Sequence, residues 1–130
     1  MTMPHERTRS LRWGYQLLGE MILDTTIDAS MRAVAQRLLE TYPNPEMVLT
    51  LINADAPKLP EEAAAALVAA GELWRRLRRS DQGTEETRHN LLFTERHFPD
   101  ASTASMLSRE NHDGLRIWLL PEDHYVHRKP

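Results

Sequence analysis

The sequence contains no cysteine, few aromatic residues and only five glycines among its 130 residues. Without cysteine the chain forms no disulfide and offers no thiolate ligand for zinc, a composition compatible with a reducing compartment. The scattered glycines exclude a glycine-rich phosphate loop. The net charge of −3 does not favour attraction of the whole chain to nucleic acid or to an anionic membrane.

Long apolar runs are also missing. The longest purely apolar segment covers residues 63–70, which is far too short to span a bilayer. The first ten residues, MTMPHERTRS, are charged and lack the apolar region of a secretory signal. We therefore expect no membrane contact and a cytoplasmic location. The length fits a single helical domain, residues 1–121, followed by a polar tail, residues 122–130.

The clearest element is the segment 59–80. Pro60 suits the first helical position, two glutamates follow it, and four arginines crowd the last turn, which matches the polarity of the helix dipole. Apolar residues at helical spacing predict a long central helix; they are Ala63, Ala66, Leu67, Ala70, Leu73, Trp74 and Leu77. A self-association seam is the alternative for its alanine-rich half, since Ala64, Ala65, Val68 and Ala69 widen that stripe.

Residues that favour the start of a helix recur along the rest of the chain. We predict a first helix from near Pro4 to a loop at 24–26, and four more at about 28–41, 45–53, 85–97 and 101–109. Gly14 and Gly19 each cost about 1 kcal/mol inside a helix relative to alanine. Glycine also allows close helix approach, so both residues fit a packed helix better than an isolated one.

The C-terminal part is open to two interpretations. Residues 115–120, LRIWLL, form the strand-like run of the sequence. Either a short helix at 101–109 precedes an extended segment, or residues 106–110 and 115–119 form a hairpin around Asp113 and Gly114. The fold we expect is all-α, an orthogonal bundle of five to six helices around the long central helix, with a short extended C-terminal segment.

Two stretches in the first fifty residues resemble a family of short uncharacterised proteobacterial proteins. These begin M-T-x-P-x-E-R-T-R and continue with a helix that ends in L-L-R-H-Y-P. The matching residues are Pro4, Glu6, Arg7, Thr8 and Arg9 at the start, and Leu38, Leu39, Tyr42 and Pro43 later. Glu40 and Thr41 replace the usual Arg-His. The resemblance implies a helical bacterial protein and brings no function with it.

No residue pattern predicts catalysis or a cofactor. Glu86 and His89 have the spacing of carboxylate–histidine metal bundles, but the sequence has no second Glu-x-x-His, so we expect a solvated helix face. A loose cluster of His112, Asp113, His124 and His127 falls in a turn and a tail, which does not favour a metal site. We therefore predict no catalytic residue, no metal and no cofactor.

Three groups of side chains are candidates for partner contact, because Arg and Trp are enriched at interface hot spots. Four arginines at a helix C-terminus also suit the dipole, with Glu85 and Glu86 close in sequence to pair with them. The LRIWLL run docks on its own core, pairs with a second copy, or adds to a partner's sheet. The candidates are Arg9, Arg12 and Trp13; Trp74, Arg75, Arg76, Arg78 and Arg79; and Trp118.

The combined features favour a small non-enzymatic regulatory or adaptor protein that binds another protein and forms a homodimer. An antagonist that sequesters a regulator or a defence complex fits the size, the charge and the missing catalytic motifs. The alternative is a nucleic-acid-binding regulator that uses the arginine cluster Arg75, Arg76, Arg78 and Arg79, with Trp74 available for stacking.

Overall fold

The computed structural model describes residues 3–54, 59–108, 119–120 and 122. Within these ranges the chain is built of α-helices and contains no strand, which confirms the predicted all-α class. The helices are α1 (Pro4–Leu23), α2 (Ala29–Leu39), α3 (Pro45–Ile52), α4 (Glu61–Arg79), α5 (Glu85–Arg96) and α6 (Ala101–Leu107). Each begins within a residue of its predicted start.

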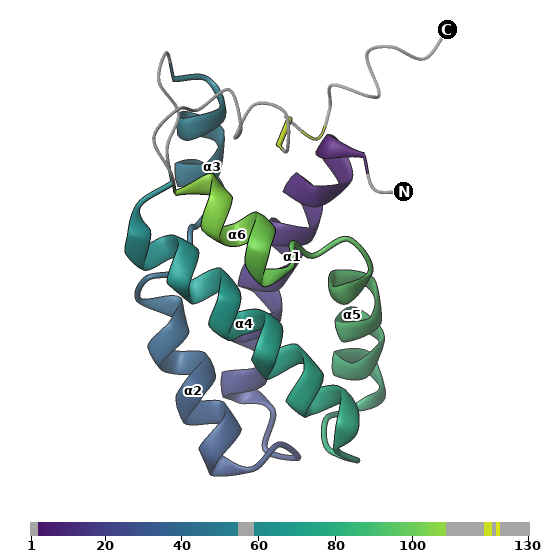
Figure 1. Cartoon of the computed structure of the whole chain (residues 1–130). Coiled ribbons are helices and arrows are strands. Elements are labelled where there is room, and N and C mark those ends of the chain that lie inside the picture. Colours follow the sequence, from purple (N-terminus) through teal and green to yellow (C-terminus); the bar gives the residue numbers. More distant parts are fainter. Residues whose placement is uncertain (1–2, 55–58, 109–118, 121, 123–130) are drawn as a thin grey trace, which may run out of the picture.

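The two longest helices, α1 and α4, lie on opposite sides of the bundle (Figure 1). Helices α2 and α5 each pack against both of them, so these four helices surround one core. Helix α6 packs on α4, and α3 packs on α1. The predicted helical bundle is confirmed, and α4 is central to it, but α1 packs against as many neighbours as α4 does.

Side-chain caps fix four of the helix starts. In each case the capping oxygen accepts a hydrogen bond from the backbone N–H three residues later, which satisfies a donor that the helix itself leaves open. The pairs are Asp28 with Met31 at 2.8 Å, Asn44 with Met47 at 2.8 Å, Thr84 with Thr87 at 3.2 Å, and Asp100 with Thr103 at 2.8 Å. The start signals in the sequence therefore correspond to real caps.

The apolar stripe of α4 is buried along its whole length. Its alanine-rich half packs inside the monomer, because α2 and α6 cover α4 and Ala63, Ala66 and Ala70 are at most 3 % exposed. Of the residues that widen the stripe, Ala64 is also buried and Ala65 is exposed. The burial favours the core interpretation of this half over the self-association seam.

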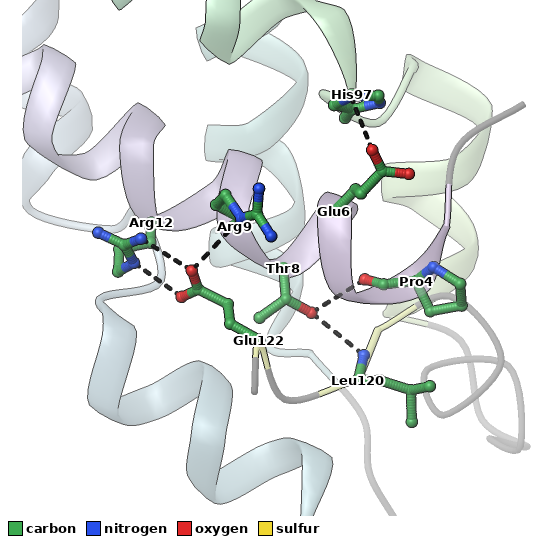
Figure 2. A network of polar contacts seen from close by, with 8 residues as sticks. All are labelled: Pro4, Glu6, Thr8, Arg9, Arg12, His97, Leu120 and Glu122. Atoms are coloured by element: carbon green, nitrogen blue, oxygen red, sulfur yellow. Dashed lines mark hydrogen bonds and ion pairs between the residues drawn. The ribbon is translucent and has the colours of Figure 1, made fainter. Parts of the chain in front are cut away.

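The hairpin alternative is wrong at its start, because Met106 and Leu107 belong to α6. Most of the LRIWLL run, residues 115–118, lies outside the described residues. Of its last two residues, Leu119 is 2 % exposed, and the backbone N–H of Leu120 donates to Thr8 Oγ1 at 3.1 Å (Figure 2). The end of the run therefore lies against the first turns of α1.

Gly14 of α1 allows side chains of the core to approach the helix backbone closely. The Tyr42 hydroxyl, buried in the core, donates to the Leu11 carbonyl at 2.7 Å and occupies the space where a side chain at position 14 would start. Phe98 closes the same space from another side. Gly19 has no neighbour within 4 Å of the corresponding position. The expectation of close packing therefore holds for Gly14 and is wrong for Gly19.

We predict opposite effects of alanine at these two glycines. Gly14→Ala forces the new methyl group into the Tyr42 hydroxyl and is expected to lower the free energy of unfolding by about 1–3 kcal/mol. Gly19→Ala meets open space and gains helix propensity, so a rise of about 0.5–1 kcal/mol is expected. Urea unfolding of both variants measures the difference. Equal effects would contradict the contact with Tyr42.

Asp24 joins the end of α1 to the start of α5. It is 9 % exposed, and its carboxylate accepts hydrogen bonds from Thr26 N and Oγ1 at 3.0 and 2.6 Å, from Thr84 N at 3.0 Å, and from Thr87 Oγ1 at 2.9 Å. Burial by itself raises the pKa of Asp24, but the hydrogen bonds outweigh it and lower the pKa to about 2. The folded state therefore favours the charged carboxylate.

We predict that Asp24→Asn lowers the free energy of unfolding by about 2 kcal/mol at pH 7, since a depressed pKa contributes stability above the unfolded value. The ordinary pKa is 3.8. The contribution is therefore complete above about pH 5 and falls through the window from about pH 4 to about pH 2. Urea titrations at pH 7 and pH 3 are expected to show the wild-type advantage reduced by about half at pH 3.

Asp81→Asn is the matched control, because Asp81 is exposed. Its effect is expected to stay within about 0.5 kcal/mol. A difference between wild type and Asp24→Asn that does not shrink with falling pH would contradict the role of the charged carboxylate.

Candidate functional site

Helices α1 and α5 lie side by side and run in opposite directions. Three polar contacts join them at successive levels: Ser10 Oγ donates to the Thr94 carbonyl at 2.6 Å, Asn90 Nδ2 donates to the Glu20 carboxylate at 2.9 Å, and His97 Nε2 lies 3.2 Å from Glu6 Oε2 (Figure 2 shows this last pair). Asp24 and Thr87 close the opposite end. The two helices therefore form one continuous outer surface.

A groove of about 380 Å³ opens between the two helices. We call the partly exposed aromatic side chains of its lining the rim, and the buried Thr94 the floor. Aromatic and polar side chains together are typical of sites that recognise peptides or small molecules. The lining residues are Trp13, Gln16, Glu20, His89, Asn90, Phe93 and Thr94. A second hollow continues from Glu20 towards Leu23 and Glu86.

Ring contacts hold the aromatic rim in place. The Trp13 and Phe93 rings meet edge to face with centroids 6.2 Å apart, and His89 meets Phe93 at 4.7 Å. The Arg9 guanidinium lies 5.6 Å from the Trp13 ring, and that of Arg96 lies 5.5 Å from Phe93. Trp13 and Phe93 are half-buried, and His89 and Arg96 are exposed. These aromatic and arginine side chains are of the types enriched at interfaces, and they are at least partly exposed to solvent.

We call this region the α1–α5 surface. Its two ends carry opposite charge, because Arg9 and Arg96 lie near the start of α1 and the end of α5, whereas Glu20 and Glu86 lie near the other ends. The uncharged and aromatic residues fill the middle. Its members are Arg9, Trp13, Gln16 and Glu20 from α1, and Glu86, His89, Phe93 and Arg96 from α5.

The predicted group Arg9, Arg12 and Trp13 lies on this side of α1. Arg12 is committed to an internal contact, because Nε and Nη2 donate to the two Glu122 carboxylate oxygens at 2.7 and 2.8 Å (Figure 2). Hydrogen bonding to Glu122 raises the pKa of Arg12. Arg9 lies 3.8 Å from the same carboxylate and keeps its contact with Trp13. Arg9 and Trp13 thus remain candidates for partner contact, and Arg12 anchors Glu122.

Trp74 does not belong with the surface candidates. Its side chain is 1 % exposed and meets Phe98 edge to face at 5.8 Å, because the α4 stripe that carries it faces the core. Trp74 is therefore a core residue and is not accessible to a partner or for stacking. Trp118 lies outside the described residues.

The arginine cluster Arg75, Arg76, Arg78 and Arg79 is exposed at the end of α4. Arg76 donates to Ser30 Oγ at 3.0 Å, and Arg78 pairs with Glu95 at 3.0 Å. The predicted acidic partners were Glu85 and Glu86 at the start of α5, but the residue that faces Arg78 is Glu95, in the last turn of that helix. The last α4 carbonyls are instead bonded by Arg88, which reaches Leu77 at 3.2 Å and Arg78 at 3.1 Å.

Among the described residues no group of three or more His, Asp or Glu side chains is arranged to hold a metal ion. The pair Glu86 and His89 lies on the α1–α5 surface, and the cluster His112, Asp113, His124 and His127 lies outside the described residues. Within the same ranges, no helix combines the length and the apolar character needed to cross a membrane.

Sequence reasoning did not select Gln16, Glu20, Phe93 or Arg96 as site residues. The signal was present as two stripes at helical spacing: Trp13, Gln16 and Glu20 on one helix, and His89, Phe93 and Arg96 on the other. Each stripe alone looks like an ordinary solvated face. Only the pairing of α1 with α5 brings the two stripes together.

The floor of the groove contains an unusual hydroxyl. Thr94 is fully buried, and its Oγ1 has no hydrogen-bond partner within the described structure, although its carbonyl accepts from Ser10. Thr87, two turns earlier on α5, is also buried but donates to Asp24 at 2.9 Å. Both residues are buried threonines of α5, and they therefore differ mainly in the hydrogen bonding of their hydroxyl groups.

We predict that valine has different effects at these two positions. Thr94→Val removes an unpaired buried hydroxyl and is expected to leave stability unchanged or to raise it by up to about 1 kcal/mol. Thr87→Val removes a bond to a charged carboxylate and is expected to lower stability by about 1–3 kcal/mol. Thermal or urea unfolding measures both. A large loss at Thr94 would show that its hydroxyl has a partner in the folded protein.

Comparisons of the chain with protein-family models, with curated proteins and with solved structures find no match.

Proposed function

We propose that this chain is a small non-enzymatic regulatory or adaptor protein of the bacterial cytoplasm, and that it acts by binding another protein through the α1–α5 surface. The observation that carries the proposal is the position of Trp13. It is half-buried at the rim of a groove, and its ring contacts both the Arg9 guanidinium and the Phe93 ring. Aromatic and arginine side chains in this arrangement are the usual anchors of protein interfaces.

The charge pattern of the surface supports a protein ligand over a nucleic acid. Two arginines at one end are balanced by two glutamates at the other. A phosphate backbone requires cationic side chains along its path, and the acidic end of this surface would repel it. A protein offers both signs of charge and apolar side chains for the aromatic middle.

A nucleic-acid-binding regulator is the second candidate, because the four guanidiniums of the arginine cluster are exposed on one helix end. Two facts weaken it. Trp74, which would supply stacking, is buried, and Arg78 is already paired with Glu95. The protein-binding function therefore has the stronger support.

We predict that capture of a partner from the source organism depends on the α1–α5 surface. Trp13→Ala combined with Phe93→Ala removes the aromatic anchors and is expected to reduce capture at least tenfold, a typical loss of about 1.4 kcal/mol or more for a hot spot. Leu92→Ala is the matched control, since Leu92 is an exposed apolar residue of α5 that does not line the groove. Circular dichroism checks that each variant is folded.

Unchanged capture by the double variant would contradict the proposal. The second candidate predicts a different result: binding to DNA or RNA that weakens steeply with salt and is lost when all four arginines of the cluster are replaced by glutamine. Absence of any binding to DNA or RNA at low salt would exclude it.

A further inference from the structure

On each helix of the α1–α5 surface, one arginine and one glutamate are separated by nearly the same distance. Arg9 and Glu20 are eleven residues apart on α1, and Glu86 and Arg96 are ten residues apart on α5. At 1.5 Å per residue these separations are about 16 Å and about 15 Å. Because the helices are antiparallel, both arginines lie at one end and both glutamates at the other. Glu122, 3.8 Å from Arg9 and 2.7 Å from Arg12, and Glu6, 3.2 Å from His97, compensate part of the positive charge at the arginine end. The patch is therefore polar along its length, with the arginines at one end and the glutamates Glu20 and Glu86 at the other.

Such a patch is complementary to itself in one orientation. When two identical faces meet through a two-fold axis in the plane of contact, the direction of the axis decides which residues face each other. An axis parallel to the helices sets each basic end against the partner's basic end. An axis perpendicular to them sets α1 against the partner's α1 in the opposite direction. Arg9 then faces Glu20, and Arg96 faces Glu86, twice each.

The same axis places the aromatic residues at the centre. The midpoint between Arg9 and Glu20 falls between Trp13 and Gln16, and the midpoint on α5 falls between His89 and Phe93. Each half-buried Trp13 ring would then lie beside the partner's Trp13, and each Phe93 ring beside the partner's Phe93. Aromatic residues at the centre with charges at the rim is the usual organisation of an interface.

The size of the surface sets the expected strength. Helix α5 has 12 residues, so it is about 18 Å long, and two adjacent helices are about 20 Å wide. This area is below the roughly 800 Å² per partner of a standard interface. The expected complex is therefore a weak, transient dimer.

We propose that the α1–α5 surface binds the same surface of a second copy of this chain, with α1 against α1 and α5 against α5 in opposite directions. This inference rests on the proposed protein-binding function and names the second copy as an occupant of that surface. Another protein that uses the same surface competes with the dimer, so partner binding and dissociation of the dimer are coupled.

Charge reversal on α5 tests the proposal in the full chain. Glu86 and Arg96 are both exposed. Glu86→Arg places like charges opposite each other at two places in the dimer, and so does Arg96→Glu. Sedimentation velocity from about 10 to 500 µM, the range that covers a micromolar dissociation constant, is expected to show wild-type association. Each single variant is expected to be weakened at least tenfold. An equimolar mixture of the two variants regains opposite pairs, and its association is expected to return to near the wild-type level.

Arg79→Glu and Glu62→Arg are the matched controls, because both residues are exposed on α4, away from this surface. They change the net charge by the same amounts and are expected to leave association unchanged. Circular dichroism verifies folding of all four variants. Higher salt is expected to weaken the wild-type dimer.

A wild-type chain that stays monomeric at 500 µM overturns the proposal. Association that both single variants retain, or that their mixture does not restore, also overturns it. These results are separate from the capture experiment. If the wild type is monomeric and the Trp13→Ala, Phe93→Ala variant still loses its captured partner, the second copy is excluded and the protein-binding function stands.

Discussion

The hydrogen bonds of Asp24 determine how the α1–α5 surface is assembled. One carboxylate ends α1, bonds the backbone before α5, and bonds the buried Thr87 hydroxyl inside α5. Its negative charge also lies at the α5 N-terminus, where the helix dipole stabilises an anion. With that end fixed, the two helices run antiparallel, and their polar contacts at Glu20, Ser10 and Glu6 follow at successive levels. The groove exists because these levels are in register.

Most of the helices could be predicted because their signals are local. Caps such as Asn44 and Thr84, and the apolar spacing of α4, act within a few residues of the chain. Core contacts between residues far apart in the sequence could not be predicted from such local signals. Nothing in the local sequence distinguishes Gly14 from Gly19, yet the Tyr42 hydroxyl, from a segment 28 residues further along the chain, makes one essential to packing and leaves the other replaceable.

The candidate site was predictable only in part, because residue type can be read from the sequence but exposure and neighbouring helices cannot. Arg9 and Trp13 were selected by residue type, and both lie on the surface. Trp74 was selected by residue type as well, but it lies on the buried stripe of α4, whose own apolar spacing already indicated the core. Phe93 and Glu20 were missed because their meaning depends on a neighbouring helix. A residue type suggests what a side chain can bind, whereas exposure and neighbours decide whether it does.

The contacts beneath the surface also affect the entropy of binding. Tyr42 fixes the inner side of α1, and Arg9, Phe93 and Arg96 already restrict the rings at the rim. Side chains that are held in one rotamer before binding lose less conformational freedom when a partner arrives, and each such side chain saves about 0.5–1.5 kcal/mol. In the proposed complex, this rigidity offsets part of the limited area of the surface.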